Sequence, residues 1–339
     1  MKKGLILGLF LLLGWFLFGQ SDNPKDIFAD YETMRAHIGQ LYQQRQFAEA
    51  AEVLDKALLL FPDHLEANTF NLCLMNVHLN RLEKALEALE YGHDHGIWYG
   101  KYTFLADVWK PLTENDGFER IWARNEAMRL EGQKKVSAKL KLCAPEGFTE
   151  TKKYPLFIAL HGGGENLDVF IPQWTSSLMK RDFVVAYPQS SQMISMAGFN
   201  WTEDLEQTKK EILTAYQAAL QSYSIDTEQV IIGGFSSGGV AALVAALEET
   251  IPVSGFVVLC PAKPDIFTPE IVQKAKSRGI KGTLITTEMD GRLASQKEMA
   301  RIMDEEGFPL TFIVTPNIGH WYPKDLATQI DQAIKDILK

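Results

Sequence analysis

Residues 230–246 have the sequence Val-Ile-Ile-Gly-Gly-Phe-Ser-Ser-Gly-Gly-Val-Ala-Ala-Leu-Val-Ala-Ala, and this stretch decides the fold of the second part of the chain. The apolar run 230–232 predicts a buried strand, and the small apolar residues 240–246 predict a helix. Between them stands Ser236, with a glycine two positions away on either side. A serine on such a tight strand-to-helix turn is held in a strained conformation with its Oγ exposed. The stretch therefore predicts covalent catalysis by Ser236.

A second motif is His161-Gly162-Gly163-Gly164, which follows the strand-like run 156–160. Consecutive glycines leave backbone N–H groups unobstructed and let the chain approach a substrate carbonyl closely. We predict that Gly162 and Gly163 form one half of an oxyanion hole. The N–H of Ser237, at the start of the helix that follows Ser236, would form the other half. A plain turn is the alternative interpretation of the glycine run.

The candidate general base is His320. The chain has two histidines after residue 130, His161 and His320, and His161 is assigned to shaping the glycine loop. His320 lies after the β-branched run 311–314, on a loop that would follow the last strand. Such loops, at the carboxyl ends of parallel strands, are where an open α/β sheet carries its chemistry. A structural histidine satisfied by local hydrogen bonds is the alternative.

The candidate acid of the triad is Asp290. It comes directly after the strand-like run 282–287, where a carboxylate can accept the Nδ1–H of the base and fix its tautomer. Glu288 and Asp265 are the competing acids. The alternative role for Asp290 is to cap a helix that starts near Leu293.

The chain order of these residues is Ser236, Asp290, His320, with the glycine loop upstream, and it differs from the orders in chymotrypsin-like and subtilisin-like proteases. With this order, the region from about 136 to 339 resembles the α/β-hydrolase superfamily. Within it, the region is similar to the serine esterases grouped with phospholipase/carboxylesterases, dienelactone hydrolases and polyhydroxyalkanoate depolymerases. The resemblance implies a doubly wound, mostly parallel sheet. The motifs that carry it are Leu160-His161-Gly-Gly-Gly, Tyr187-Pro188, Trp201, Ser224-Ile225-Asp226, Gly233-Gly234-Phe235-Ser236-Ser237-Gly238-Gly239 and Gly319-His320.

The hydrophobic pattern predicts the same α/β fold class without the resemblance. Short apolar or β-branched runs, most of them separated by helix-length segments, indicate a largely parallel sheet covered on both faces. Residues 205–219 and 326–338 are the clearest helices. The predicted strands are 136–142, 156–160, 183–187, 230–232, 256–259, 283–286 and 311–314.

Four residues in the glycine loop, the serine turn and the segment 189–201 are expected to contact the substrate: His161, Gly164, Trp201 and Phe235. The segment 189–201 carries methionines and aromatic residues and is expected either to form a pocket wall or to turn these side chains into the core. About 20 residues separate Pro261 from the strand that begins at Gly282, which is too few for a large lid.

The first residues predict export. Met1-Lys2-Lys3 precedes an uninterrupted apolar run from Leu5 to Phe18, and small residues follow. We interpret residues 1–21 as a signal peptide, which places the mature protein in the periplasm or outside the cell, without an integral membrane span. An uncleaved membrane anchor is the alternative, but about 16 residues at a rise of 1.5 Å give roughly 24 Å, which is short for a bilayer span.

Residues 22–130 predict a separate all-α domain before a catalytic domain at 131–339. The Ala/Leu pattern of residues 46–62 recurs about 35 positions later in residues 80–89, and this resembles tetratricopeptide repeats. Such a short array is expected either to pack on the hydrolase as an accessory domain or to dock a protein partner. The motif His93-Asp94-His95 has no converging ligands in the sequence, so we predict no metal site.

Composition limits the ligands. A net charge of −9 argues against nucleic acid and anionic lipid surfaces as partners. The cysteines Cys73, Cys143 and Cys260 cannot form a disulfide framework, and free buried thiols are expected, with Cys143 and Cys260 as the alternative pair. The sequence contains no phosphate-binding glycine motif and no Cys/His cluster, so we predict no cofactor.

Together these features predict an exported serine hydrolase. It would cleave a carboxylic ester, on a small molecule or borne on a polymer, through a Ser-His-Asp triad and an acyl-enzyme. The alternatives are a peptidase or thioesterase that uses the same triad, and a non-catalytic binding protein that docks a partner through its repeats.

Overall fold

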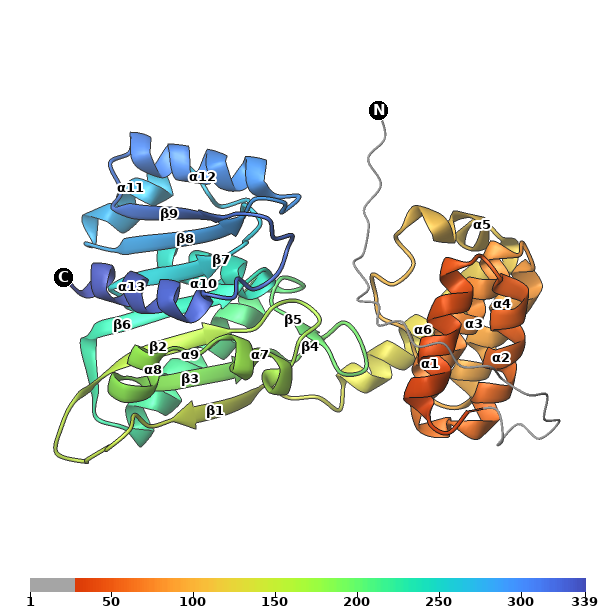
Figure 1. The fold of residues 1–339 in the computed structure, drawn as a ribbon. Helices are drawn as coiled ribbons and strands as arrows, with labels where there is room; N and C mark the ends of the chain where they lie inside the picture. Colours follow the sequence, from red (N-terminus) through yellow and green to blue (C-terminus); the bar gives the residue numbers. More distant parts are fainter. Residues whose placement is uncertain (1–27) are drawn as a thin grey trace. The chain divides into compact units, whose positions relative to one another are not determined.

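The structure is a computed structural model, and it describes residues 28–339 (Figure 1). The predicted signal peptide, residues 1–21, lies outside the described residues. The chain divides into two compact units. The first comprises the described residues up to His95 together with Ala106–Ile121, and the second comprises Gly96–Leu105 together with Trp122–Lys339. The boundary at residue 130 stays a prediction.

The first unit is all-helical, as predicted for the amino-terminal region. Its small and apolar side chains recur at helical spacing, so that Ala50, Leu54 and Ala57 fall on one buried face of their helix. Residues 46–62 correspond to α2, its N-cap and the turn that Pro62 starts, and residues 82–89 of the second segment fall in α4. The elements are α1 (Tyr31–Gln43), α2 (Phe47–Leu60), η2 (Pro62–His64), α3 (Leu65–His78), α4 (Leu82–Asp94), η3 (Asp107–Trp109), α5 (Lys110–Thr113) and the start of α6 (Asp116–Gln133). The tetratricopeptide assignment stays a prediction.

The second unit is built on a seven-stranded sheet in the order β1-β3-β2-β6-β7-β8-β9. All neighbouring strands pair in parallel except β1, which is antiparallel to β3. This confirms the doubly wound, mostly parallel sheet that the sequence predicts. The strands are β1 (Lys139–Cys143), β2 (Tyr154–Leu160), β3 (Val184–Gln189), β6 (Ile225–Phe235), β7 (Gly255–Leu259), β8 (Lys281–Thr287) and β9 (Leu310–Thr315).

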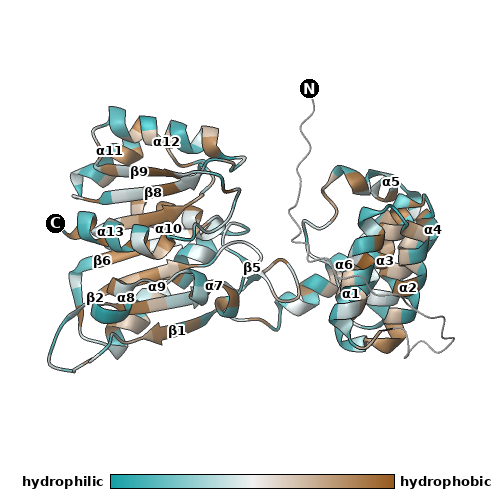
Figure 2. Ribbon diagram, viewed as in Figure 1, coloured by the Kyte–Doolittle hydropathy of each residue, from teal (hydrophilic) through white to brown (hydrophobic). Residues whose placement is uncertain are grey.

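The two faces of the sheet carry separate apolar clusters. Alternate residues of a strand point to opposite faces, so in β2 Leu156, Ile158 and Leu160 join one cluster while Phe157 and Ala159 join the other. Because both faces are covered, the strands are continuous apolar runs with little polar alternation. In Figure 2 the central strands are mostly brown, whereas much of α12 is teal.

Helices cover the cluster on each face of the sheet. Side chains of α9 (Leu205–Ser222), α10 (Ser237–Leu247), α11 (Pro269–Ser277) and α12 (Leu293–Glu305) belong to the first cluster. Side chains of α7 (Leu167–Gln173), α8 (Ser177–Asp182) and α13 (Leu326–Leu338) belong to the second. The short segment between β7 and β8 holds only α11, which agrees with the prediction that no large lid is inserted there.

The segment Gly96–Leu105 packs against a small hairpin of the second unit formed by β4 (Gln192–Met193) and β5 (Phe199–Asn200). Trp98 forms an apolar cluster with Met193 and Phe199. The N–H of Lys101 donates to the carbonyl of Ile194 at 2.9 Å. These contacts position Tyr102, which directly follows Lys101 in sequence and reaches the pocket described below.

All three cysteines, Cys73, Cys143 and Cys260, are free. Cys143 ends β1 and Cys260 follows β7, and three strands lie between these two in the sheet. At a spacing of about 4.8 Å between strands the separation is roughly 19 Å, too long for a disulfide. Within residues 28–339, no helix is long and apolar enough to cross a membrane.

Candidate active site

Ser236 lies on a sharp turn between β6 and α10. Its backbone adopts φ 51° and ψ −112°, a strained conformation for a residue with a side chain. The turn fits only because glycines flank it. A Cβ on Gly234 would lie 2.5 Å from the carbonyl oxygen of Leu160, and a Cβ on Gly238 would lie 2.3 Å from that of His161. These close approaches hold the turn against the end of β2.

The three residues predicted as a triad lie together. His320 Nε2 is 2.8 Å from Ser236 Oγ, and His320 Nδ1 is 3.0 Å from Asp290 Oδ2. The residues come from three loops, after β6, β8 and β9, at the carboxyl ends of parallel strands. Glu288, the competing acid, instead accepts the N–H of Asn317 at 3.0 Å, and Asp265 is exposed.

Asp290 is held as a carboxylate by its hydrogen bonds. It is only 6% exposed, and burial alone would raise its pKa. The hydrogen bonds from His320, from the N–H of Arg292 and from Gln296 outweigh burial, so its pKa lies below the ordinary value. An ionised Asp290 can therefore fix the Nδ1–H tautomer of His320.

The ligand atoms of Cys260, Asp290 and His320 lie within 4.8 Å of one another, a grouping that is compatible with metal ligation. Burial, together with the neighbouring Asp290 carboxylate, raises the pKa of the Cys260 thiol to about 12. A thiol must lose its proton to bind a metal, and here Asp290 and His320 are already hydrogen-bonded to each other. The hydrogen bond between Asp290 and His320, two residues of the predicted triad, accounts for this cluster.

The glycine loop offers one free donor. The N–H of Gly162 donates to Glu165 Oε2 at 2.7 Å, and the N–H of Gly164 donates to the carbonyl of Phe199 at 2.9 Å. The N–H of Gly163 has no acceptor among the described residues. Gly163 faces the start of α10, since a Cβ on it would lie 3.3 Å from Ser237 Oγ. The prediction for Gly162 is therefore corrected: Gly163 and Ser237 are the pair whose N–H groups remain for an oxyanion.

Glu165 joins the glycine loop to the loop that carries His320. It is 8% exposed, and both of its oxygens accept the hydroxyl of Tyr322, at 2.9 and 2.8 Å. Burial raises the pKa of Glu165 despite the hydrogen bonds that oppose this, and burial with the Glu165 charge raises the pKa of Tyr322. Tyr322 stands two residues after His320. The Glu165 carboxylate thus holds Gly162 on one side and the His320 loop on the other.

His161 and Trp201 are corrections to the predicted substrate contacts. Both are fully buried, and neither lines the pocket. The N–H of Ser190 donates to His161 Nε2 at 3.2 Å, so the proton is on Nδ1, which donates to the carbonyl of Gly162 at 2.8 Å. Burial lowers the pKa of His161 to about 4, so the ring is neutral. His161 shapes the glycine loop from below, and Trp201 packs against its ring at a centroid distance of 5.0 Å.

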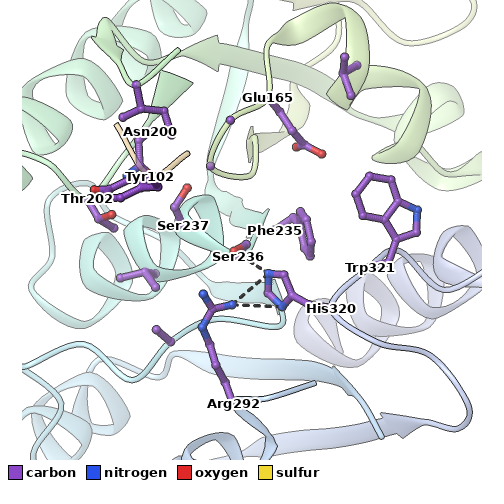
Figure 3. Close-up of a pocket in the computed structure, with 16 residues that line it drawn as sticks. Tyr102, Glu165, Asn200, Thr202, Phe235, Ser236, Ser237, Arg292, His320 and Trp321 are labelled. Carbon is purple, nitrogen blue, oxygen red and sulfur yellow. Dashed lines mark hydrogen bonds between the residues drawn. The ribbon is translucent and has the colours of Figure 1, made fainter. Parts of the chain in front are cut away.

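A cavity of about 780 Å³ opens above Ser236, a volume typical of a small-molecule site. Of the predicted residues, Gly163, Gly164, Phe235, Ser236, Ser237 and His320 line it. In Figure 3 Tyr102, Asn200 and Thr202 lie to one side of Ser236, and Trp321 lies to the other. The methionine and aromatic side chains of segment 189–201 pack into the apolar clusters. Ile194 and Asn200 are the residues of this segment that line the pocket.

Several pocket residues are missed by the sequence interpretation. Glu165, Arg292 and Trp321 lie one or two positions from predicted site residues, and this proximity in sequence could have indicated them. Tyr102 has no such indication, because it reaches the pocket only through the packing of Gly96–Leu105 on the β4–β5 hairpin.

Arg292 is the charged residue next to the base. Its guanidinium Nη1 lies 3.2 Å from His320 Nδ1 and 3.0 Å from Nε2 (Figure 3). Asp290 and Ser236 occupy the in-plane positions at these two nitrogens, so Nη1 lies over the face of the ring. Arg292 caps α12, and its own N–H donates to Asp290 Oδ1 at 2.9 Å.

Comparison with known proteins agrees with this architecture. Residues 149–265 match the Phospholipase/Carboxylesterase family, and no curated protein matches the chain. An uncharacterized protein from Bacillus cereus ATCC 10987 is similar in structure, with a TM-score of 0.52 and 25% identity over 91% of this chain and 98% of that chain.

Two further solved structures align with about three fifths of this chain. Esterase PE8 has a TM-score of 0.48 and 16% identity, and covers 60% of this chain and 100% of its own. S-formylglutathione hydrolase from Staphylococcus aureus has a TM-score of 0.45 and 15% identity, and the match covers 60% of this chain and 93% of that chain. The parallel sheet, the serine turn and the family match together lead to one conclusion. The second unit of this chain has the α/β-hydrolase fold, and residues 149–265 within it are similar to the phospholipase/carboxylesterase family.

Proposed function

We propose that the protein is a serine esterase that cleaves a carboxylic ester through an acyl-enzyme on Ser236. The observation that carries the proposal is the pair of hydrogen bonds that links Ser236 Oγ to His320 Nε2 and His320 Nδ1 to Asp290. A nucleophile, a base and an orienting acid in this sequence of contacts have the geometry that serine catalysis requires.

In the first half of the reaction, Ser236 Oγ attacks the ester carbonyl carbon and its proton passes to His320 Nε2. The carbonyl oxygen becomes an oxyanion, which the N–H groups of Gly163 and Ser237 stabilise. The bond to the alcohol oxygen then breaks, and the alcohol leaves with the proton from Nε2. An acyl group remains on Ser236.

In the second half, water attacks the acyl carbonyl while His320 Nε2 takes its proton. The tetrahedral intermediate uses the same two N–H donors, and its collapse returns the proton to Ser236 Oγ and releases the acid. Asp290 stays ionised throughout, and it stabilises the imidazolium that forms twice in each cycle.

The electrostatics support an oxyanion at this place. Ser237 begins α10 and lines the pocket, so the positive end of the helix dipole lies at the pocket. Within the described residues, Ser237 Oγ is buried without a hydrogen-bond partner, and a bound oxyanion would give it one. Each such donor contributes about 10²- to 10³-fold to the rate.

The experiment compares the wild-type protein with Ser236→Ala and Asp290→Asn on short and medium acyl p-nitrophenyl esters. We expect kcat to fall about 10⁴-fold or more in each variant, because the triad acts as a unit. Glu298→Gln is a matched control, since this exposed acid on α12 pairs with Lys263 outside the pocket lining. Hydrolysis by Ser236→Ala at the wild-type rate would exclude the proposal.

The same triad could serve a thioesterase or a peptidase. Matched acyl esters, thioesters and amides separate these reactions, and we propose that the ester has the highest kcat/KM. We also propose that residues 1–21 direct export. Sequencing of the amino terminus of the protein recovered outside the cytoplasm tests this second proposal.

A further inference from the structure

The position of Arg292 is at odds with the charge that catalysis creates. His320 becomes an imidazolium each time it takes a proton, and a second cation in contact with its ring disfavours that state. Nη1 of Arg292 is 3.0 Å from Nε2, the atom that takes the proton. Asp290 offsets one positive charge of the His320–Arg292 pair, and an anionic group in the reacting complex would offset the other.

Among the described residues, no carboxylate lies within ion-pair distance of the Arg292 guanidinium. Asp290, two residues before Arg292, directs Oδ2 to His320, and its Oδ1 accepts the backbone N–H of Arg292 rather than the guanidinium. Glu165 lines the pocket, and both of its carboxylate oxygens already accept hydrogen bonds, from the hydroxyl of Tyr322 and the N–H of Gly162.

Among residues 28–339, no lysine and no other arginine lines this pocket. Lys101 neighbours Tyr102, but it is paired with Glu203 and lies outside the lining of the cavity. Arg292 is exposed and lines the cavity, so its donors are accessible to a bound molecule. An arginine guanidinium offers several N–H donors in a planar fork that matches a carboxylate.

The geometry also indicates which half of the ester carries the anion. The alcohol oxygen must approach Nε2 to receive its proton when the bond breaks. Nη1 of Arg292 lies beside this same atom, over the face of the ring. The oxyanion donors Gly163 and Ser237 lie on the glycine loop and at the start of α10. A group attached to the leaving alcohol is therefore the part of the substrate closest to Arg292.

We propose that Arg292 is a specificity residue that binds an anionic group on the alcohol portion of the ester. This inference rests on the proposed serine esterase function. A carboxylate on the alcohol would pair with the guanidinium and neutralise it next to His320, so the charge that opposes the imidazolium is removed when the correct substrate is bound. Esters of hydroxy acids are the substrate class that fits.

The test uses two esters that differ only in this charge, 4-acetoxybenzoate and its methyl ester, both of which release a phenol that can be followed by absorbance. The measured quantity is the ratio of kcat/KM for the acid over that for the methyl ester. We expect Arg292→Gln to lower this ratio about 10- to 100-fold, the range for loss of a charge-assisted hydrogen bond. Arg292→Lys keeps the charge but not the planar fork of donors, so its ratio should lie between those of the wild type and Arg292→Gln.

Arg301→Gln is the matched control, because Arg301 lies on the same helix but pairs with Glu305 and does not line the cavity. Its ratio should equal that of the wild type. The product 4-hydroxybenzoate also tests binding, as an inhibitor of the cleavage of the acetyl group from methyl 4-acetoxybenzoate. We expect the inhibition constant of 4-hydroxybenzoate to rise in Arg292→Gln by a similar factor.

Two results would overturn the inference. One is a ratio that Arg292→Gln leaves unchanged. The other is an equal loss on both esters, which would make Arg292 a residue that only positions His320. Failure of the esterase function itself is distinguished by the wild type, which would then hydrolyse neither ester at a rate above that of Ser236→Ala.

Discussion

Glu165 Oε2 accepts the backbone N–H of Gly162 at 2.7 Å, and this hydrogen bond determines which glycine of the loop can act on a substrate. It occupies the N–H of Gly162, whereas the N–H of Gly163 has no acceptor among the described residues. The same carboxylate accepts the hydroxyl of Tyr322 from the His320 loop. One buried acid therefore joins the two loops that carry Gly163 and His320, the proposed oxyanion donor and the proposed base.

The first prediction concerns Glu165. Glu165→Ala should lower kcat about 10-fold or more with little change in KM, because the N–H of Gly163 loses its position for the transition state while the pocket wall remains. Steady-state kinetics on a p-nitrophenyl ester measure this split. Glu165→Gln, which keeps an oxygen for Gly162, should recover part of the loss. A rise in KM with kcat unchanged would contradict a role in positioning the loop.

The second prediction concerns His161 and pH. Its pKa is about 4 in the folded protein against an ordinary 6.5, so the unfolded chain binds more protons between these values. Its contribution to stability is thus present above pH 6.5 and is lost as the pH falls toward 4. The difference corresponds to roughly 3 kcal/mol. Urea unfolding at several pH values measures how the free energy of unfolding changes with pH. Between pH 4 and 6.5 this slope should be shallower in His161→Asn than in the wild type. Equal slopes in the two proteins would refute this assignment.

The third prediction concerns Trp201, which the structure places in the core. Trp201→Leu should lower the free energy of unfolding by about 2–4 kcal/mol, because it leaves a cavity beside the ring of His161. Denaturant unfolding measures the loss. If Trp201 instead contacted the substrate, the variant would keep its stability and show a raised KM.

The fourth prediction concerns Tyr102, which lines the pocket from the segment Gly96–Leu105. Tyr102→Ala should raise KM about 5- to 30-fold for an ester with an aromatic group, as expected when an aromatic contact is truncated. Leu105→Ala is the control, since Leu105 is 76% exposed on the same segment and is not part of the pocket. A KM that is the same in both variants would remove Tyr102 from the substrate site.

The sheet and the serine turn could be predicted from sequence because their determinants are local. Strand β6, the elbow and α10 are contiguous, and Gly234 and Gly238 mark the turn in the sequence, although the close approaches that require them are to the end of β2. The strands themselves are continuous apolar runs, since both faces of the sheet are covered.

The roles of individual loop residues could not be predicted, because a loop has no periodicity that fixes where a side chain points. Phe235 and Trp201 both stand beside predicted motifs, yet Phe235 lines the pocket and Trp201 is buried. The assignment of Gly162 needed the position of Glu165, and the place of Tyr102 needed long-range packing against Met193 and Phe199. Such information appears only once the chain is folded.

The central claim is that Ser236 forms the covalent intermediate. Its most direct test is the intact mass of the protein after reaction with a fluorophosphonate, followed by peptide mapping of the adduct. The account predicts one phosphonyl group per chain, located on Ser236, with no adduct on Ser236→Ala and hydrolysis lost in proportion to labelling. An active wild-type protein with no adduct, or with the adduct on another residue, would contradict it.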